Sequence, residues 1–334
     1  MSEPETLPIT LLTGFLGSGK TTLLRRALVS PLLADTAVVI NEIGEIAIDH
    51  HLVDFVAGDV VELPGGCLCC AMREDLARTL RGLIDRRMTG AVRPFRRVVV
   101  ETTGLADPAP ILYTLGAEPM LDHTLHLAAI VTLVDALSGF DTLDRFAEAA
   151  RQVALADRLV ISKTDLVPSG AALIARLDRL NPRAPRILAA AAEDPGMLLF
   201  AAGGSAMPNP AAAEAQPHAA HSHGISSFTI SLGGQFSRLD FARALGGLAR
   251  SRGYDLLRVK GIVCFSDRPQ RPAVVQAAQH AMFAPEWLDR WPPGWPTDRH
   301  GSRNRLVFVV HDIGLADILD HFAFAAAAPW PGDG

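Results

Sequence analysis

The chain is short of several features that mark particular protein classes. It has only 4 cysteines among 334 residues, three of them within Cys67-Leu68-Cys69-Cys70, where they are poorly placed to join distant segments, which excludes a secreted disulfide scaffold. It has no surplus of positive charge, with 31 Lys and Arg against 36 Asp and Glu, which excludes a basic nucleic-acid binder. No apolar run approaches the roughly 18 residues of a membrane span, and the acidic N-terminus, with Glu3 and Glu5, does not predict a signal peptide. We therefore expect a cytoplasmic protein that partners neither a membrane nor a nucleic acid.

What the chain does have is a globular composition and a regular alternation of apolar runs with helix-like stretches. Hydrophobic residues make up 49% of it, and its length suggests about two domains. In residues 1–200, apolar runs predict strands at Leu7–Thr13, Ala37–Asn41, Val60–Leu63, Arg97–Glu101, Leu125–Val134 and Arg158–Ser162. The spacing of apolar residues predicts helices at Thr21–Val29 and Ala71–Arg87, with further helices between the later strands. This alternation predicts an α/β domain with a mostly parallel sheet covered on both faces.

A change of composition separates this region from the rest. Residues 201–223 are rich in Ala, Gly, Pro and His and lack apolar periodicity, so we expect a flexible linker. In residues 224–330 the pattern predicts strands Ser227–Leu232, Leu256–Phe265 and Leu306–His311, an alternating stretch Ala273–Phe283, and helices near Arg238–Ala249 and Leu315–Phe324. Because strands follow strands here, we expect a smaller C-terminal α+β domain with helices on one face. Cys264 lies alone in one of these predicted strands, and we expect it in the core of this domain.

A glycine-rich loop follows the first predicted strand. Gly14-Phe15-Leu16-Gly17-Ser18-Gly19-Lys20-Thr21 fits the phosphate-binding pattern G-x-x-x-x-G-K-[ST], between a strand and a helix. Backbone amides and the helix N-terminus would face the phosphates, Lys20 would bridge the β- and γ-phosphates, and the Thr21 hydroxyl would hold Mg²⁺. The predicted nucleotide-binding set here is Gly14, Gly17, Ser18, Gly19, Lys20, Thr21 and Thr22. The alternative, a glycine turn that caps a core helix, leaves a lysine at a buried helix start unexplained.

An acidic residue ends the strand Arg97–Glu101. Because ligands bind at the carboxyl ends of parallel strands, we expect Glu101 to lie near the phosphate loop and to reach Mg²⁺ through water. Gly104, three residues later, would let its amide approach the γ-phosphate. Glu101 and Gly104 join Lys20 and Thr21 as the predicted catalytic residues, against the alternative of an ordinary solvated strand end.

The motif Ser162-Lys163-Thr164-Asp165 follows a later strand of the same predicted sheet. The Asp165 carboxylate can accept hydrogen bonds from both N1–H and the exocyclic amine of guanine, a pair of donors that adenine lacks. The aliphatic stem of Lys163 can lie along the base. Ser162, Lys163 and Asp165 therefore predict a guanine site, which favours GTP over ATP.

The cysteine cluster predicts a metal site. Cys67, Cys69 and Cys70 lie beside two glycines that allow a tight turn, and thiolates bind soft or borderline cations such as Zn²⁺. Glu42 is our candidate for a further ligand, with a solvated loop acid as the alternative. Cys67 and Cys70 also form a C-x-x-C pattern, so a redox pair and inert buried thiols remain open. The histidine tract His218, His221 and His223 could collect metal ions.

Together these motifs resemble the CobW-type family of P-loop GTPases. The motifs that carry the resemblance are Gly14–Thr22, Asn41-Glu42-x-Gly44-Glu45, Gly66-Cys67-x-Cys69-Cys70, Glu101–Gly104 and Ser162–Asp165, with Arg258-x-Lys260-Gly261 and Arg303-x-Arg305 in the second domain. The resemblance implies a GTP hydrolase that acts as a metal chaperone or insertase. Its thiols would bind the cargo, and its nucleotide state would gate binding and release. Ser162 departs from the asparagine common at its position, so we expect softer guanine selectivity.

The expected ligands are therefore GTP or GDP, Mg²⁺, and Zn²⁺ or another divalent transition metal, with an unidentified client metalloprotein as partner. Three alternatives stay open. One is a GTPase that serves cobalamin synthesis or the activation of one metalloenzyme. Another is a nucleotide-regulated thiol redox protein, and the third is a binding switch with negligible turnover.

Overall fold

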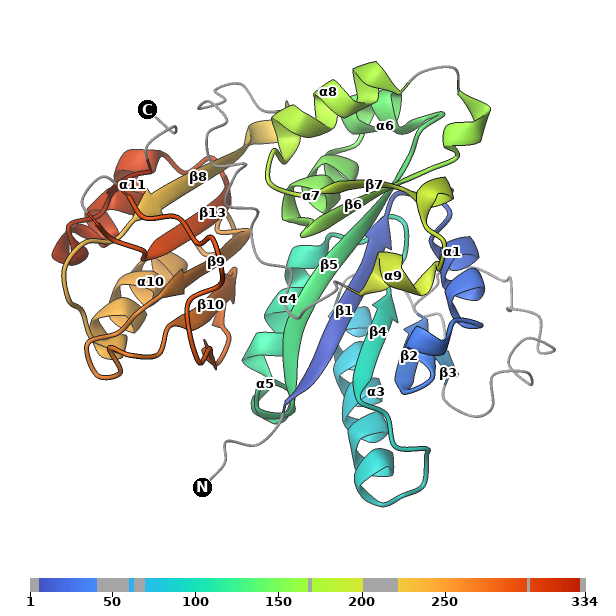
Figure 1. Ribbon diagram of the computed structural model, residues 1–334, viewed down its shortest axis with the longest axis horizontal. Coiled ribbons are helices and arrows are strands. Elements are labelled where there is room, and N and C mark those ends of the chain that lie inside the picture. Colours follow the sequence, from blue (N-terminus) through green and yellow to red (C-terminus); the bar gives the residue numbers. More distant parts are fainter. Residues whose placement is uncertain are drawn as a thin grey trace. The chain divides into compact units, whose positions relative to one another are not determined.

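The computed structural model describes residues 6–40, 60–62, 70–167, 170–200, 222–298 and 301–330 (Figure 1). Contacts between residues divide the chain into two compact units. The N-terminal unit comprises Met1–Arg176 with Ala184–Ala206, and the C-terminal unit comprises Leu177–Arg183 with Met207–Gly334. Each unit has its own sheet.

The N-terminal unit is built on a seven-stranded sheet in which every pair of neighbours is parallel. The strand order is β3-β2-β4-β1-β5-β6-β7. The strands are β1 Leu7–Gly14, β2 Thr36–Ile40, β3 Val60–Glu62, β4 Arg97–Glu101, β5 Leu125–Asp135, β6 Arg158–Ser162 and β7 Arg186–Leu188. The predicted α/β class with a mostly parallel sheet is confirmed. Because all strands run the same way, the loops that follow β1, β4, β5 and β6 meet at one edge of the sheet.

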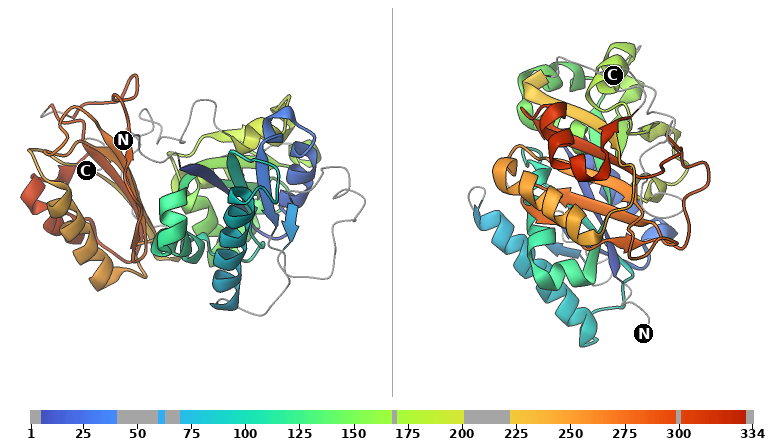
Figure 2. Two further views of the ribbon diagram at one scale, coloured as in Figure 1. Left: turned by 90° about the horizontal axis from the view of Figure 1, so that it is seen from below. Right: turned by 90° about the vertical axis from the view of Figure 1, so that its left-hand side faces the viewer.

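Helices connect these strands and cover both faces of the sheet (Figure 2). They are α1 Lys20–Ala27, α3 Cys70–Met88, α4 Pro108–Ala117, α5 Pro119–Thr124, α6 Gly139–Arg145, α7 Ala147–Leu155, α8 Ala171–Leu180 and α9 Gly196–Leu199. On one face, α1 and α9 pack on the sheet through a buried apolar cluster that includes Leu24, Val99 and Leu198. On the other face, α7 packs against β1 and β5, and α4 packs against α3, α5 and α7. The parallel strands are thus buried on both sides, which explains their uninterrupted apolar runs.

The C-terminal unit contains an antiparallel sheet in the order β11-β10-β9-β13-β8-β14, with β12 paired to β10. Its strands are β8 Ile225–Ser231, β9 Arg258–Val263, β10 Ala273–Ala278, β11 Ala281–Met282, β12 Glu286–Trp287, β13 Arg305–His311 and β14 Ala328–Pro329, and its helices are α10 Arg238–Arg252 and α11 Leu315–His321. Both helices pack into the same apolar cluster, through Leu245 of α10 and Ile318 of α11, against Phe308 of β13. The predicted α+β class with helices on one face is confirmed.

The alternating stretch Ala273–Phe283 forms the strands β10 and β11, because the chain turns at Gln279, whose φ of 52° lies in the left-handed region. The expectation for Cys264 needs correction. Cys264 follows β9 instead of lying inside it, and it is half-buried and outside the core. Its thiol donates to the Pro269 carbonyl at 3.1 Å, and burial raises its pKa. None of the described helices is long and apolar enough to cross a membrane.

Candidate functional site

The phosphate loop joins β1 to α1 and curls around the Lys20 ammonium group. Gly14, Gly17 and Gly19 have φ angles of 140°, 72° and 96°, values that L side chains rarely adopt, so the glycines permit the curl. Lys20 is only 8% exposed. Its Nζ donates to the carbonyls of Gly14 at 2.9 Å and Phe15 at 3.3 Å. The loop therefore holds a cation at the N-terminus of a helix, an arrangement suited to a phosphate chain.

Glu101 lies beside this loop, as the sequence pattern suggests. It ends β4, opposite Leu12 of β1, and it is fully buried rather than solvated. The Thr21 hydroxyl donates to Glu101 Oε1 at 2.7 Å. A hydroxyl and a carboxylate side by side at a phosphate loop form a hard oxygen donor set, which fits Mg²⁺ rather than a soft metal ion.

Gly104 packs against the phosphate loop. A Cβ atom added to it would lie 2.7 Å from both the backbone nitrogen and the Cα of Leu16, closer than side chains and backbone approach one another. Upstream, the Thr102 hydroxyl donates to the Thr13 hydroxyl at 2.8 Å, and the Thr102 amide donates to the Leu12 carbonyl. The segment after β4 is therefore fastened to the end of β1, and only glycine fits at position 104.

The predicted base-recognition loop follows β6, and a hydrogen bond joins it to the phosphate loop. The Ser162 hydroxyl donates to the Ser18 carbonyl at 2.6 Å. Lys163, with a left-handed φ of 55°, forms an ion pair with Asp135, Nζ to Oδ2, at 2.5 Å. Asp165 is exposed on the short 3₁₀ turn Thr164–Leu166, where a base could reach it.

Asp135 is a further candidate site residue, absent from the set predicted from the sequence. It ends β5, opposite Ser162 of β6, and it also accepts a hydrogen bond from the Leu137 amide at 2.7 Å. Burial raises the pKa of Asp135, but the hydrogen bonds from Lys163 and the Leu137 amide outweigh it, so the pKa lies below its ordinary value. At neutral pH the carboxylate is ionised and anchors Lys163. An acid at the carboxyl end of a parallel strand, the signal that identified Glu101, would have found it.

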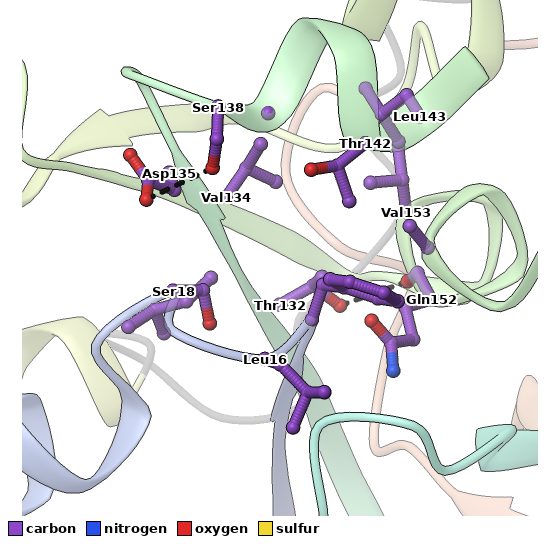
Figure 3. A pocket seen from close by; sticks show the side chains of 14 residues that line it. Leu16, Ser18, Thr132, Val134, Asp135, Ser138, Thr142, Leu143, Gln152 and Val153 are labelled. Carbon is purple, nitrogen blue, oxygen red and sulfur yellow. Dashed lines mark hydrogen bonds between the residues drawn. The ribbon is translucent and has the colours of Figure 1, made fainter. Parts of the chain in front are cut away.

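A cleft lies behind the phosphate loop, between the end of β5 and helices α6 and α7 (Figure 3). Its polar lining includes Ser18, Thr132, Asp135, Ser138, Thr142 and Gln152. Phe15 of the phosphate loop also lines it, and its ring contacts Phe146, the residue before α7, with centroids 4.7 Å apart. The phosphate loop therefore contacts the residue that precedes α7.

Most of the predicted metal ligands lie outside the described residues. Cys67, Cys69, Glu42, His218 and His221 all fall in this category, as do most of the predicted linker and the side chain of Cys70, which begins α3. His223 is described and exposed. Within the described parts of the chain, no group of three or more His, Cys, Asp and Glu side chains could hold a metal ion. The cysteine site thus stays a prediction.

A phosphate loop, a Mg²⁺-type donor pair and a base-recognition loop on one edge of a parallel sheet define a P-loop nucleotide-binding protein. Residues 8–188 match the family described as "CobW/HypB/UreG, nucleotide-binding domain". Residues 225–326 match the "Cobalamin synthesis protein cobW C-terminal domain". The chain belongs to the CobW family, and the resemblance seen in the motifs is confirmed.

Similar proteins include named zinc chaperones. The zinc chaperone YjiA of Escherichia coli is 33% identical over 288 residues, which cover 85% of this chain and 90% of YjiA. The zinc chaperone CobW of Sinorhizobium sp is 28% identical, with 93% of this chain and 95% of that protein covered. A solved structure of the Zn(II)-bound YjiA GTPase from Escherichia coli matches with a TM-score of 0.67 and 27% identity, over 96% of this chain and 99% of that one.

Proposed function

We propose that this protein is a Mg²⁺-dependent GTP hydrolase of the cytoplasm that binds a divalent metal ion, preferentially zinc, and delivers it to a client protein. The observation that carries the nucleotide half is the hydrogen bond from Ser162 to the Ser18 carbonyl, because it joins the base loop to the phosphate loop. The metal half is supported by similarity to zinc chaperones along nearly the whole chain. A client in cobalamin synthesis or in the activation of one metalloenzyme would be a narrower form of this proposal.

In this proposal each residue has a defined role toward GTP. Lys20 pairs with the β- and γ-phosphates, and the amides of Gly17, Ser18 and Gly19 surround the phosphate chain. Thr21 would hold Mg²⁺ and Glu101 would reach it through water, and the bound ion would supply positive charge close to the phosphate oxygens. The Gly104 amide meets the γ-phosphate. Catalysis of this kind depends on positioning and electrostatics rather than on covalent steps.

Guanine recognition is proposed to fall to Asp165, with Lys163 along the base and Asp135 holding Lys163 in place. Replacing Asp165 with asparagine should shift the preference from GTP toward xanthosine triphosphate. Asparagine can donate to the oxygen that xanthine has in place of the guanine amine. Its single carbonyl oxygen cannot accept from both N1–H and that amine, as the two oxygens of aspartate do. A site built to pair with a polar group rejects an analogue that lacks it by large factors. Competition binding of the two nucleotides measures this, and equal GTP affinity in both proteins would refute the role of Asp165.

The metal half is tested by linkage between zinc and nucleotide. If the cysteine turn and Glu42 bind zinc and respond to the γ-phosphate, zinc affinity should differ between the GDP-bound and GTP-bound protein. Coupling of this type is typically about 1–3 kcal/mol, or roughly 5–150-fold in affinity, and zinc must alter the preference between the two nucleotides by the same factor. The measurement is a Zn²⁺ titration against a competing chelator, with GDP and with a non-hydrolysable GTP analogue. Identical affinities in the two states would rule out nucleotide gating.

The matched variant changes Cys67, Cys69 and Cys70 to serine together. It should lose tight zinc binding and keep GTP binding, because the thiols are not needed to surround the phosphates. Metal analysis of the wild-type protein, purified under reducing conditions, separates the redox alternative. Stoichiometric metal supports a chaperone, whereas a reversible disulfide without metal supports thiol redox work.

A further inference from the structure

Helix α7 is hydrogen-bonded to the segment that follows β4. This segment, residues 104–107, is here called the sensor segment. The Nε2 of Gln152 donates to the carbonyl of Gly104 at 3.2 Å and to the carbonyl of Ala106 at 2.9 Å. The Ala106 amide in turn donates to the Thr103 carbonyl at 3.1 Å, which closes a turn around Gly104. One side-chain amide therefore donates to two carbonyls of this turn, one on buried Gly104 and one on half-buried Ala106.

The surroundings of the Gln152 side chain fix its position and the orientation of its amide. The residue is 1% exposed and lies among apolar residues of α7, and its own backbone carbonyl accepts a hydrogen bond from the Thr132 hydroxyl at 2.9 Å (Figure 3). Its Oε1 is buried, with no hydrogen-bond donor in the described parts of the chain. A flipped amide would place this oxygen against two carbonyl oxygens, so the two acceptors determine the orientation.

We propose that Gln152 is a positioning residue that holds Gly104 in place to sense the γ-phosphate. The inference rests on the proposed GTP hydrolysis and adds a residue to it. Fixing the Gly104 carbonyl fixes the peptide plane that follows the glycine, and a glycine has no side chain of its own to restrict its rotation. A Cβ at Gly104 would collide with the Leu16 backbone. The turn is therefore packed between the phosphate loop and the side chain of Gln152.

The same helix also contacts the phosphate loop. Phe146, directly before the first residue of α7, packs its ring on that of Phe15. Helix α7 thus touches the phosphate loop near its start and the sensor segment near its middle. If the sensor segment shifts when the γ-phosphate arrives or leaves, either the two Gln152 hydrogen bonds must change or α7 must move with the segment.

Replacing Gln152 with leucine removes both donors and keeps a similar volume. We expect single-turnover GTP hydrolysis to fall at least about 10-fold, because one buried and one half-buried carbonyl lose their donor. The preference for a non-hydrolysable GTP analogue over GDP should fall by a similar factor, while GDP affinity stays within about two-fold, since GDP does not engage the sensor. Thermal unfolding of the same samples shows whether the variant is folded.

Gln152→Glu supplies a readout that a purely structural role would not move. A carboxylate cannot donate, but the carboxyl group introduced by this substitution could donate to one carbonyl when it is protonated, and burial raises its pKa. The hydrolysis rate of this variant relative to wild type should therefore rise as the pH is lowered from about 8 to about 6, whereas the ratio for the leucine variant stays flat. The matched control is Arg151→Met, which breaks the half-exposed ion pair of Arg151 with Asp107 in the same segment and should change hydrolysis little.

The outcomes distinguish this inference from the proposed function. If the wild-type protein hydrolyses GTP and the folded leucine variant keeps both its rate and its nucleotide preference, the positioning role is wrong and the proposed function stands. Equal losses in Arg151→Met and Gln152→Leu would also overturn it, because general loosening of α7 would explain both. A wild-type protein that neither hydrolyses GTP nor distinguishes its analogue from GDP would overturn the proposed function and this inference together.

Discussion

Replacing Lys20 with alanine should abolish productive GTP binding and turnover. The loop is curled around this ammonium group, which is almost fully buried at the start of α1, so its charge is fixed within the loop. Removing one preorganised donor from such a site costs about 10²–10³ in kcat, and Lys20 carries a full charge, so we expect a loss of at least about 10³-fold in kcat/KM. Phosphate-release kinetics over a range of GTP concentrations measure it.

Arg26→Ala is the matched control for this variant. It removes a cation from the same helix, but from an exposed position in its last turn, and it should leave hydrolysis unchanged. Circular dichroism and thermal unfolding of both variants report the fold. A folded Lys20→Ala protein with wild-type hydrolysis would show that the glycine-rich loop is only a helix cap.

Gly104→Ala should slow hydrolysis by about two orders of magnitude. The added methyl group would lie 2.6 Å from the Leu16 side chain and 2.7 Å from the Leu16 backbone. The side chain can turn away, but the backbone of the phosphate loop cannot yield without changing the loop itself. The sensor segment must move away from the phosphate loop, and a misplacement of about 1 Å can cost about 10²-fold in rate. GDP binding should weaken far less, because GDP has no γ-phosphate for Gly104 to meet. Single-turnover hydrolysis and GDP titration, taken together, separate the two effects.

Gly82→Ala tests whether the loss is specific. This glycine lies in α3, and an added Cβ there has no neighbour within 4 Å. The same chemical change should therefore keep full activity and slightly stabilise the helix, since alanine favours helical backbone over glycine. If both glycine variants hydrolyse GTP at the wild-type rate, the close approach at Gly104 has no catalytic role.

The sequence predicts the elements of the fold well where the strands are long and buried on both faces. Strands β4 and β6 have the predicted bounds, because their apolar runs stop where the strands leave the core. Strand β7 escapes prediction, because its three residues Arg186–Leu188 contain only two apolar side chains. The division of Ala273–Phe283 escapes for another reason, since Gln279 adopts a left-handed turn without glycine or asparagine to signal it.

The candidate site divides in a similar way. Local sequence alone is enough to predict motifs such as the phosphate loop and the acid that ends β4. It is not enough for Gln152, because the role of this residue depends on which elements become neighbours in space, and the same holds for the pairing of Asp135 with Lys163. Periodicity predicts that β5 and β6 are strands, but it contains no information that Asp135 lies opposite Ser162. Gln152 is a polar residue on an apolar helix face. This pattern indicates that its side chain is buried and hydrogen-bonded, but it does not identify the partner.

The short strands at the sheet edges have a consequence for how the protein behaves when it is concentrated. In the described chain, the parallel sheet ends in β3 and β7 with three residues each, and the antiparallel sheet ends in β11 and β14 with two each. The central strand β5, by comparison, has 11 residues. Amyloid-like pairing needs a run of about six or seven exposed strand residues, and short edges deny it a template. A chain with so apolar a composition can therefore accumulate without its sheets extending from one molecule to the next.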